Sequence, residues 1–353
     1  MTISTDSFTG NVAPSTTNPP AVTVVIPVYN AARYIGEALD SLQAQTFKDF
    51  EVIVVNDGSD DREELESILK AHPLPLTYIS QENKGVSAAR NAAIRIGRGE
   101  FYAQLDADDQ WMPDYLKVQL GILKDNPEAT LVYPNATIIG EGATSGLEYM
   151  KINPSEGEVN FESLVRQKCV VMTCVTARMT AIRDAGMFDE SIRSCEDFDL
   201  WLRIVQNGGR IVYHRRPLVL YRRREGSLSS DRAWMARNIV RVLEKCAATF
   251  KLTTAEREVL NQNLNYQRAL LNLFEGKHAL KAGKTSAALA SFEKANEHLR
   301  RRKLAAVILL LRYVPGLVSW VYTARERSLE KQPDHKLKGI DKPRTPSSSE
   351  LAQ

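Results

Sequence analysis

The chain has 353 residues, of which 43% are apolar and 25% are charged, the ordinary composition of a soluble globular protein. Its net charge of +3 is too small to indicate a nucleic-acid partner. A domain usually takes about 100–200 residues, so the length predicts one large domain with a smaller appendage.

The four cysteines form no CxxC pair and the histidines are scattered, so no zinc site is expected. Reduced thiols in a cytoplasmic compartment are the expectation. Residues 1–20 are rich in Ser, Thr, Asn and Pro without the apolar core of a signal peptide, and residues 331–353 are charged and rich in Pro and Ser. Both segments are predicted to be disordered.

Strands and helices are predicted to alternate through the first hundred residues. Helices are expected after Tyr29, over 61–70 and over 86–96, between apolar runs that are typical of buried strands at Val22–Val28, Glu51–Val55, Leu76–Ile79 and Phe101–Leu105. Alternation at this spacing implies right-handed βαβ units and a parallel sheet.

The pattern beyond residue 130 is less regular. Strands are predicted over 131–133, 170–176, 211–213 and 218–221, and a helix over 197–205 that ends at Asn207-Gly208-Gly209. From Ser230 onward strand patterns cease. Residues 271–295 resemble one tetratricopeptide unit, and because a stable array needs about three, a helical hairpin is expected. The predicted domains are therefore 21–230, of α/β class, and 231–330, all helical.

Three polar loops each follow a predicted strand: Pro27-Val28-Tyr29-Asn30, Asn56-Asp57-Gly58-Ser59 and Asp106-Ala107-Asp108-Asp109. In an open parallel sheet such loops lie along one edge, beyond the carboxyl ends of the strands, where ligands bind. We expect these loops to line one cleft.

Carboxylates in these loops suit two kinds of chemistry. Asp106 and Asp108 offer hard oxygen donors for Mg²⁺ or Mn²⁺, although the spacing equally fits a solvated turn with an aspartate as helix N-cap before Pro113. Asp57 can accept hydrogen bonds from a nucleobase edge or form an Asx turn. Glu196 and Asp197 suit a helix N-terminus or, in Asp197, a general base for an incoming hydroxyl.

An ordered set of segments resembles the inverting GT-A glycosyltransferases of family 2. These segments are TVVIPVYNAARYIGEALDSLQAQTF, FEVIVVNDGSDD, NKGVSAARNAAI, FYAQLDADDQWMPDYL, GMFDESIRSCEDFDLWLRI and PLVLYRRREGSLS. The resemblance covers about 22–230. It implies a GT-A fold, in which a Rossmann-like mixed sheet is flanked by helices and binds a nucleotide-diphospho-sugar, with an all-α C-terminal region added.

The resemblance also implies a role for each matching residue. Pro27, Val28 and Tyr29 would form the nucleotide-binding loop, Asp57 would bind the base, and Arg90 would lie near the base or diphosphate. Asp106 would contact the ribose side and the metal, and Asp108 would coordinate Mn²⁺ or Mg²⁺. Asp197 matches the catalytic base. Where many relatives have a histidine near the metal, this chain has Arg224. Arginine cannot ligate a metal but pairs with phosphate.

The activity implied is transfer of a single sugar from a nucleotide-diphosphate sugar, preferably a UDP-sugar, to a hydroxyl group. The acceptor would be a glycan, a lipid-linked molecule or a protein. The pathway would be assembly of envelope polysaccharide, lipid-linked oligosaccharide or protein glycan. The Gln-x-x-Arg-Trp motif of processive synthases is absent. A non-catalytic nucleotide-binding scaffold with a partner-recruiting tail is the alternative, against which the retained acidic motifs count. A nucleotidyltransferase lacks support because its Gly-rich, Lys-containing signature is missing, and a dinucleotide oxidoreductase because no GxGxxG follows the first strand.

Residues 304–322 form an apolar run of nearly the length, about 20 residues, that spans a bilayer. Arg312 and Pro315 interrupt it, and a central arginine costs about 2.5–3.5 kcal/mol on insertion. A buried helix pair is one interpretation. Peripheral contact with the inner face of the cell membrane through 300–327 is the other.

Overall fold

The computed structural model of the chain describes residues 18–224 and 231–321. Outside these residues lie most of the two terminal segments that the sequence predicts to be disordered. Arg325 and Arg327 of the predicted membrane-contact segment also lie outside them. The chain divides into two compact units, one up to Arg224 and the other from residue 225 onward together with residues 141–143. Each unit is described by itself.

The first unit begins with the predicted alternation. Strand β1 (Val22–Val28), helix α1 (Ala32–Gln43), β2 (Phe50–Asp57), α2 (Arg62–Ala71), β3 (Thr77–Gln81), α3 (Val86–Ile96) and β4 (Phe101–Gln104) follow in order. Six of the seven β1 residues are buried, which explains a β-branched run with no polar alternation. Strands β2 and β4 lie parallel to β1 on its two sides, and β3 extends the sheet beyond β2.

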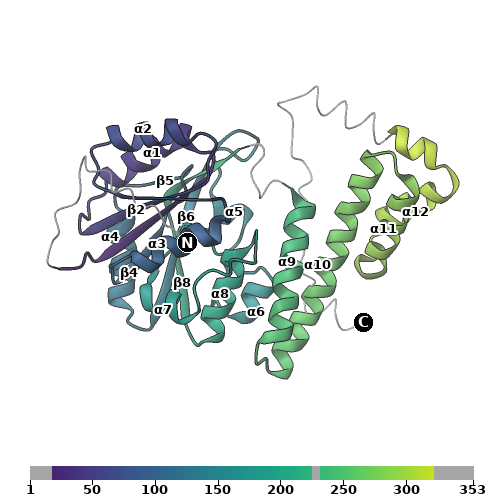
Figure 1. Cartoon of the computed structure of the whole chain (residues 1–353). Helices are drawn as coiled ribbons and strands as arrows, with labels where there is room; N and C mark the ends of the chain where they lie inside the picture. The colour runs from purple at the N-terminus through teal and green to yellow at the C-terminus, as the bar shows by residue number, and fades with distance from the viewer. Residues whose placement is uncertain (1–17, 225–230, 322–353) are drawn as a thin grey trace. The chain divides into compact units, whose positions relative to one another are not determined.

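The order of strands in the sheet is β3-β2-β1-β4-β7-β6-β8-β5. Because the chain moves outward from β1 to β3 and then returns to β4, right-handed crossovers place α1 and α2 on one face and α3 on the other, as Figure 1 shows. The remaining strands are β5 (Gln110–Trp111), β6 (Ala129–Gly140), β7 (Thr176–Arg178) and β8 (Arg210–Arg223). Since β7 is antiparallel to both β4 and β6, and β5 is antiparallel to β8, the sheet is mixed.

One strand prediction in the second half was wrong, and two other predicted strands form a single one. Residues 170–175 are not a strand, since only Thr176–Arg178 join the sheet. Four apolar side chains of this segment are nevertheless buried: Val171, Met172, Cys174 and Val175. The apolar pattern therefore indicated burial of the side chains and not pairing of the backbone with a neighbouring strand. The strands predicted over 211–213 and 218–221 form the single strand β8, which passes through Pro217 at an irregularity of its pairing with β6.

Further helices complete this unit. They are α4 (Tyr115–Asp125), α5 (Tyr149–Ile152), α6 (Phe161–Val165), α7 (Met179–Asp184) and α8 (Glu196–Gln206). Helix α8 is the helix predicted over 197–205, one residue longer at each end, and Asn207 follows it as expected.

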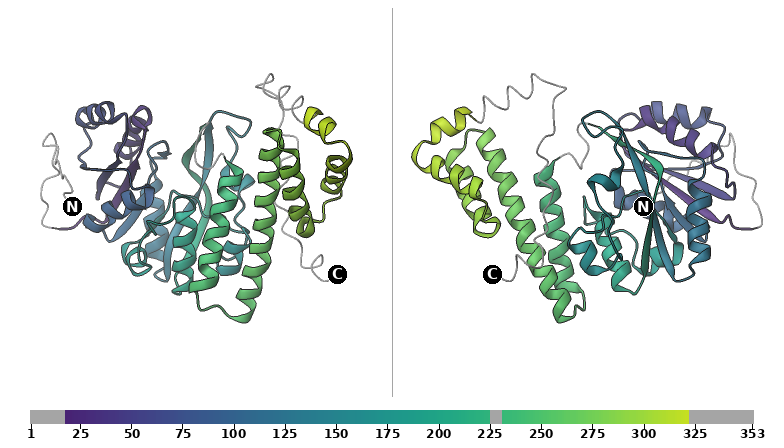
Figure 2. Two further views of the ribbon diagram at one scale, coloured as in Figure 1. Left: turned by 45° about the vertical axis from the view of Figure 1, so that its right-hand side comes forward. Right: turned by 180° about the vertical axis from the view of Figure 1, so that it is seen from behind.

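The second unit is helical, as predicted, with α9 (Arg232–Thr249), α10 (Thr254–Lys281), α11 (Thr285–Leu299) and α12 (Arg302–Tyr313). Figure 2 shows α9, α10 and α11 side by side from two further directions. Thr253 and Glu256 form a capping box at the start of α10, which satisfies otherwise unpaired N–H groups. Gly276 lets α11 approach α10, because a Cβ there would lie 2.5 Å from the Phe292 ring.

Candidate active site

The polar loops that follow β1 and β2 meet at one edge of the sheet. The backbone N–H of Asn30 donates to the Ser59 hydroxyl at 3.1 Å, and the Asn30 side chain donates to Asp60 at 3.1 Å. Of the predicted nucleotide-binding loop, Val28 is buried whereas Tyr29 is 49% exposed. Tyr29 therefore presents its ring at the edge where the strands end.

Asp57 is buried and has three hydrogen-bond donors of its own chain. Its Oδ1 accepts from the Gln81 side chain at 2.7 Å and from the Lys84 N–H at 2.9 Å, and its Oδ2 accepts from the Gly85 N–H at 2.8 Å. Gly85 immediately precedes α3. The Asp57 carboxylate, which is expected to bind the base, thus fixes the backbone directly before α3. About one of its four lone-pair positions is left for a ligand.

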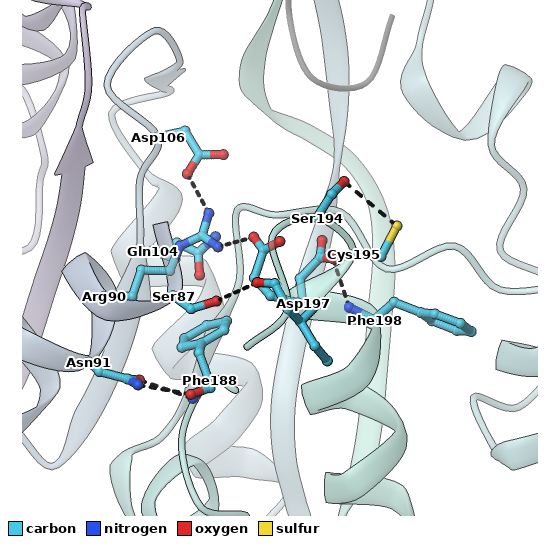
Figure 3. A network of polar contacts seen from close by, with 12 residues as sticks. Ser87, Arg90, Asn91, Gln104, Asp106, Phe188, Ser194, Cys195, Asp197 and Phe198 are labelled. Atoms are coloured by element: carbon cyan, nitrogen blue, oxygen red, sulfur yellow. Dashed lines mark hydrogen bonds and ion pairs between the residues drawn. The ribbon is translucent and has the colours of Figure 1, made fainter. Parts of the chain in front are cut away.

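Arg90, on α3, joins two acidic segments that are far apart in the sequence. Its Nη2 donates to Asp106 at 3.0 Å and its Nη1 to Glu196 at 2.5 Å, and Figure 3 shows the contact between Arg90 and Asp106. The side chain is 3% exposed. Because one guanidinium binds both carboxylates, Arg90 holds Asp106 beside Glu196 at the start of α8. Loss of either partner would leave a charge without compensation.

Two more α3 side chains hold the loop that leads to α8. Asn91 donates to the Phe188 carbonyl at 2.8 Å and accepts from the Phe188 N–H at 3.0 Å. Ser87 donates to the Ile192 carbonyl at 3.3 Å. The Ser-Ala-Ala-Arg-Asn stretch of α3 therefore fixes residues 188–196 by three side chains, of which Figure 3 shows Asn91 against Phe188.

Asp197 lies in the first turn of α8, next to this bridge. Its Oδ1 accepts the N–H of Phe198 at 2.7 Å. Burial raises the pKa of Asp197 to about 7, with a further rise from Glu196 that Arg90 partly offsets. A carboxylate whose pKa lies near neutral pH suits a general base. Cys195, directly before the pair, has a φ of 63°, a left-handed conformation that is uncommon for residues other than glycine and often marks a functional site.

The aspartates after β4 differ in their partners. Asp108 pairs with the Arg224 Nε at 2.9 Å, and burial together with Asp106 raises its pKa. Asp109 is 2% exposed and accepts the Arg222 N–H at 2.8 Å, so it ties the loop to β8. Burial and its two neighbouring aspartates raise the pKa of Asp109 well above the ordinary value.

Two arginines at the end of β8, Arg222 and Arg224, lie against the Asp106–Asp109 loop. The Arg222 guanidinium donates to the Asp108 carbonyl at 3.0 Å and to Glu37 at 2.5 Å. The guanidinium carbons of Arg222 and Arg224 lie 5.0 and 5.7 Å from the centre of the Tyr34 ring, within cation–π range. Arginines fixed in this way suit a phosphate group.

The residues present fit a divalent ion that is shared with a diphosphate. In the part of the chain that the structure describes, no group of three His, Cys, Asp or Glu side chains forms a metal cage. Mg²⁺ and Mn²⁺ need only one or two carboxylates when phosphate oxygens complete the shell. Burial and, after it, the neighbouring aspartates raise the pKa of Asp108 and Asp109, and a bound cation would favour the ionised form of these carboxylates.

Comparison with known proteins agrees with this geometry. Residues 23–185 match the model of glycosyl transferase family 2. An uncharacterized glycosyltransferase of Rickettsia felis is 33% identical over 192 residues, which are 53% of this chain and 32% of that protein. A chondroitin synthase of Escherichia coli is 32% identical over 208 residues, 56% of this chain and 29% of that protein. The chain thus spans about a third of the length of each of these relatives.

Solved structures share the fold. S. aureus TarS 1-349 in complex with UDP has a TM-score of 0.56 at 20% identity, over 91% of this chain and 94% of that one. The mannosyltransferase PcManGT from Pyrobaculum calidifontis, in complex with GDP-Man and Mn²⁺, has a TM-score of 0.55 at 21% identity, over 90% of each chain. The fold is therefore GT-A, and residues 23–185 have the sequence pattern of glycosyltransferase family 2. The expected family and fold class are confirmed.

The structure brings most of the predicted site residues into one connected set. Asp57 fixes the start of α3, α3 carries Arg90, and Arg90 bridges Asp106 to the residue before Asp197. Arg224 and Asp108 pair on the same acidic loop. Sequence reasoning missed that Glu196 is the partner of Arg90 and that Asp109, Arg222 and Asn91 fix the surrounding segments. Only the position of Asn91 beside Arg90 in the family motif could have indicated one of them.

Proposed function

We propose that this chain is a glycosyltransferase that moves a single sugar from a nucleotide-diphosphate donor, preferably a UDP-sugar, to a hydroxyl acceptor with inversion at the anomeric carbon. The observation that carries the proposal is the buried Arg90 bridge. It holds the aspartates that suit a diphosphate-bound cation next to a carboxylate that suits a general base. Both functions are needed on one side of the sheet for a single displacement.

In this mechanism Asp197 removes the proton of the acceptor hydroxyl, whose oxygen then bonds to the anomeric carbon while the bond to the diphosphate breaks. A positioned base contributes about 10²–10⁴-fold. Arg224 pairs with a diphosphate oxygen and supports the leaving group. A divalent ion held by Asp106 and Asp108 would, when bound, offset negative charge on that leaving group.

Donor binding involves the loops that follow β1 and β2. Pro27, Val28 and Tyr29 line the nucleotide, with the exposed Tyr29 ring available for stacking on a base. Asp57 acts on the base with its remaining acceptor capacity and fixes the start of α3. The acceptor is a glycan, a lipid-linked sugar or a protein. The four cysteines are free and buried, which suits a reducing, cytoplasmic compartment.

The test measures nucleoside diphosphate released from a panel of nucleotide sugars, first without and then with candidate acceptors. We expect slow hydrolysis of one donor class, and loss of that hydrolysis in Asp197→Asn. Asp125→Asn, which changes an exposed carboxylate at the end of α4, is the matched control and should retain the wild-type rate. Tight donor binding with no turnover under any condition would instead favour the non-catalytic scaffold.

A further inference from the structure

The C-terminal part of the described chain has an apolar surface that its own helices do not cover. One side of α12 packs into the core of the helical unit through Leu304 and Leu311, with Val307, Ile308 and Val318 partly buried against it. The opposite side, here called the outer face, remains exposed. It consists of Leu309, Leu310, Tyr313, Val314, Leu317, Trp320 and Val321.

The outer face has two parts. Leu309, Leu310 and Tyr313 lie on α12 at intervals of one, three and four residues, the spacing of one side of a helix. The helix is interrupted at Val314, and Leu317, Trp320 and Val321 have the same spacing on the helical residues 315–321. Tyr313 is 77% and Trp320 69% exposed. A segment that is apolar all round and packs on one side only has an apolar surface left for a partner.

The charges around this surface indicate which partner fits. Arg300, Arg301, Arg302 and Lys303 directly precede the apolar part, and no acidic residue occurs from His298 to Tyr322. Arg302 and Lys303 are exposed. The next basic residue, Arg312, pairs with Glu293 at 2.6 Å. An apolar surface with a cluster of cations and with exposed Trp and Tyr fits a layer that combines acyl chains with anionic headgroups.

We propose that the outer face, together with residues 300–303, binds the surface of a membrane that contains anionic phospholipid. Leu310, Leu317 and Trp320 enter the boundary between headgroups and acyl chains, and Arg302 and Lys303 contact the headgroups. The helix lies on the bilayer and does not cross it. In keeping with this, within 18–224 and 231–321 none of the helices combines the length and apolar character that a spanning segment requires.

The experiment is flotation of the full chain with vesicles of phosphatidylcholine alone or mixed with phosphatidylglycerol. We expect the chain to float with the mixed vesicles and much less with neutral ones. Leu310→Asp combined with Trp320→Asp should lower the bound fraction on the order of tenfold. Arg302→Gln and Lys303→Gln should each weaken binding about fivefold, because each basic residue near an anionic surface contributes about 1 kcal/mol.

Ile96→Asp combined with Leu147→Asp is the matched control, because it places the same two charges on exposed apolar residues of the other unit and should float like the wild type. Fluorescence gives a second readout that does not depend on folding of a charged variant. Trp111 and Trp201 are buried and Trp234 is partly buried, whereas Trp320 is 69% exposed, so vesicles should shift the emission to shorter wavelength chiefly through Trp320. Trp320→Phe should bind and lose most of this shift.

Two results would overturn the proposal. The first is failure of the wild type to float with anionic vesicles, or equal flotation of the Leu310→Asp/Trp320→Asp variant. The second is a wild type that is dimeric by light scattering and becomes monomeric in that variant while vesicle binding is absent, since the occupant would then be a second copy of the chain. Neither result bears on donor turnover, so the proposed activity stands or falls separately.

Discussion

Asp197→Asn should lower turnover and at the same time stabilise the fold at alkaline pH. Burial raises the pKa of Asp197 from 3.8 to about 7, so the folded state binds its proton more tightly than the unfolded state does. Stability then falls as pH rises from about 4 to about 7. One pKa unit corresponds to about 1.4 kcal/mol, which sets an upper limit of about 4 kcal/mol at pH 8.

Asparagine has the same shape and does not ionise, so the variant should escape this penalty. Chemical denaturation at pH 4.5 and pH 8 should show a variant that gains on the order of 2–4 kcal/mol over the wild type between the two conditions. Other titrating groups cancel in this difference, since both proteins carry them. Turnover should fall by about 10²–10⁴-fold. Asp125→Asn is the control for both measurements.

The two readouts together decide the reasoning. A stability difference between wild type and Asp197→Asn that does not change with pH would show that Asp197 does not titrate near neutrality. A wild-type rate in the variant would remove Asp197 from the mechanism even if the stability difference appeared as expected.

Four further outcomes are expected. The wild-type kcat/KM should fall about tenfold for each pH unit below about 7, because a protonated Asp197 cannot act as base, and a flat profile would contradict this. Asp108→Ala should abolish the effect of Mn²⁺ on donor affinity, which calorimetry with and without Mn²⁺ measures. Arg90→Met should cost about 3 kcal/mol of stability, because it leaves the buried Glu196 and the partly buried Asp106 without their cation; a melting temperature equal to that of the wild type would argue against the bridge. Gly276→Ala should cost about 1–3 kcal/mol, since the added Cβ meets the Phe292 ring at 2.5 Å, as thermal unfolding would show.

The sequence by itself determined the first half of the fold and the candidate residues for the proposed chemistry. Strands such as Val22–Val28 are covered on both faces. Their unbroken apolar runs can therefore be recognised in the sequence without tertiary information. Helix α3 begins and ends at the predicted residues, 86 and 96. The family motifs supplied Asp57, Arg90, Asp106, Asp108 and Asp197 because their order along the chain is itself specific.

Burial and pairing diverge where the sheet becomes mixed. Residues 170–175 are as apolar as a strand, yet the ladder includes only Thr176–Arg178. Before Thr176, the contact with β4 is reduced to one hydrogen bond, from the Gln104 N–H to the Val175 carbonyl at 3.0 Å. A local pattern records which side chains avoid water. It does not record which backbone groups find a partner.

Tertiary structure alone decided the contacts of the site and the surface of the C-terminal helices. Arg90 contacts residues 16 and 106 positions away, and no local pattern specifies a partner at such distances. The apolar run after Lys303 likewise cannot indicate which side is covered, because both sides are apolar. Packing against α11 selected Leu304 and Leu311 for the core and left Tyr313 and Trp320 exposed.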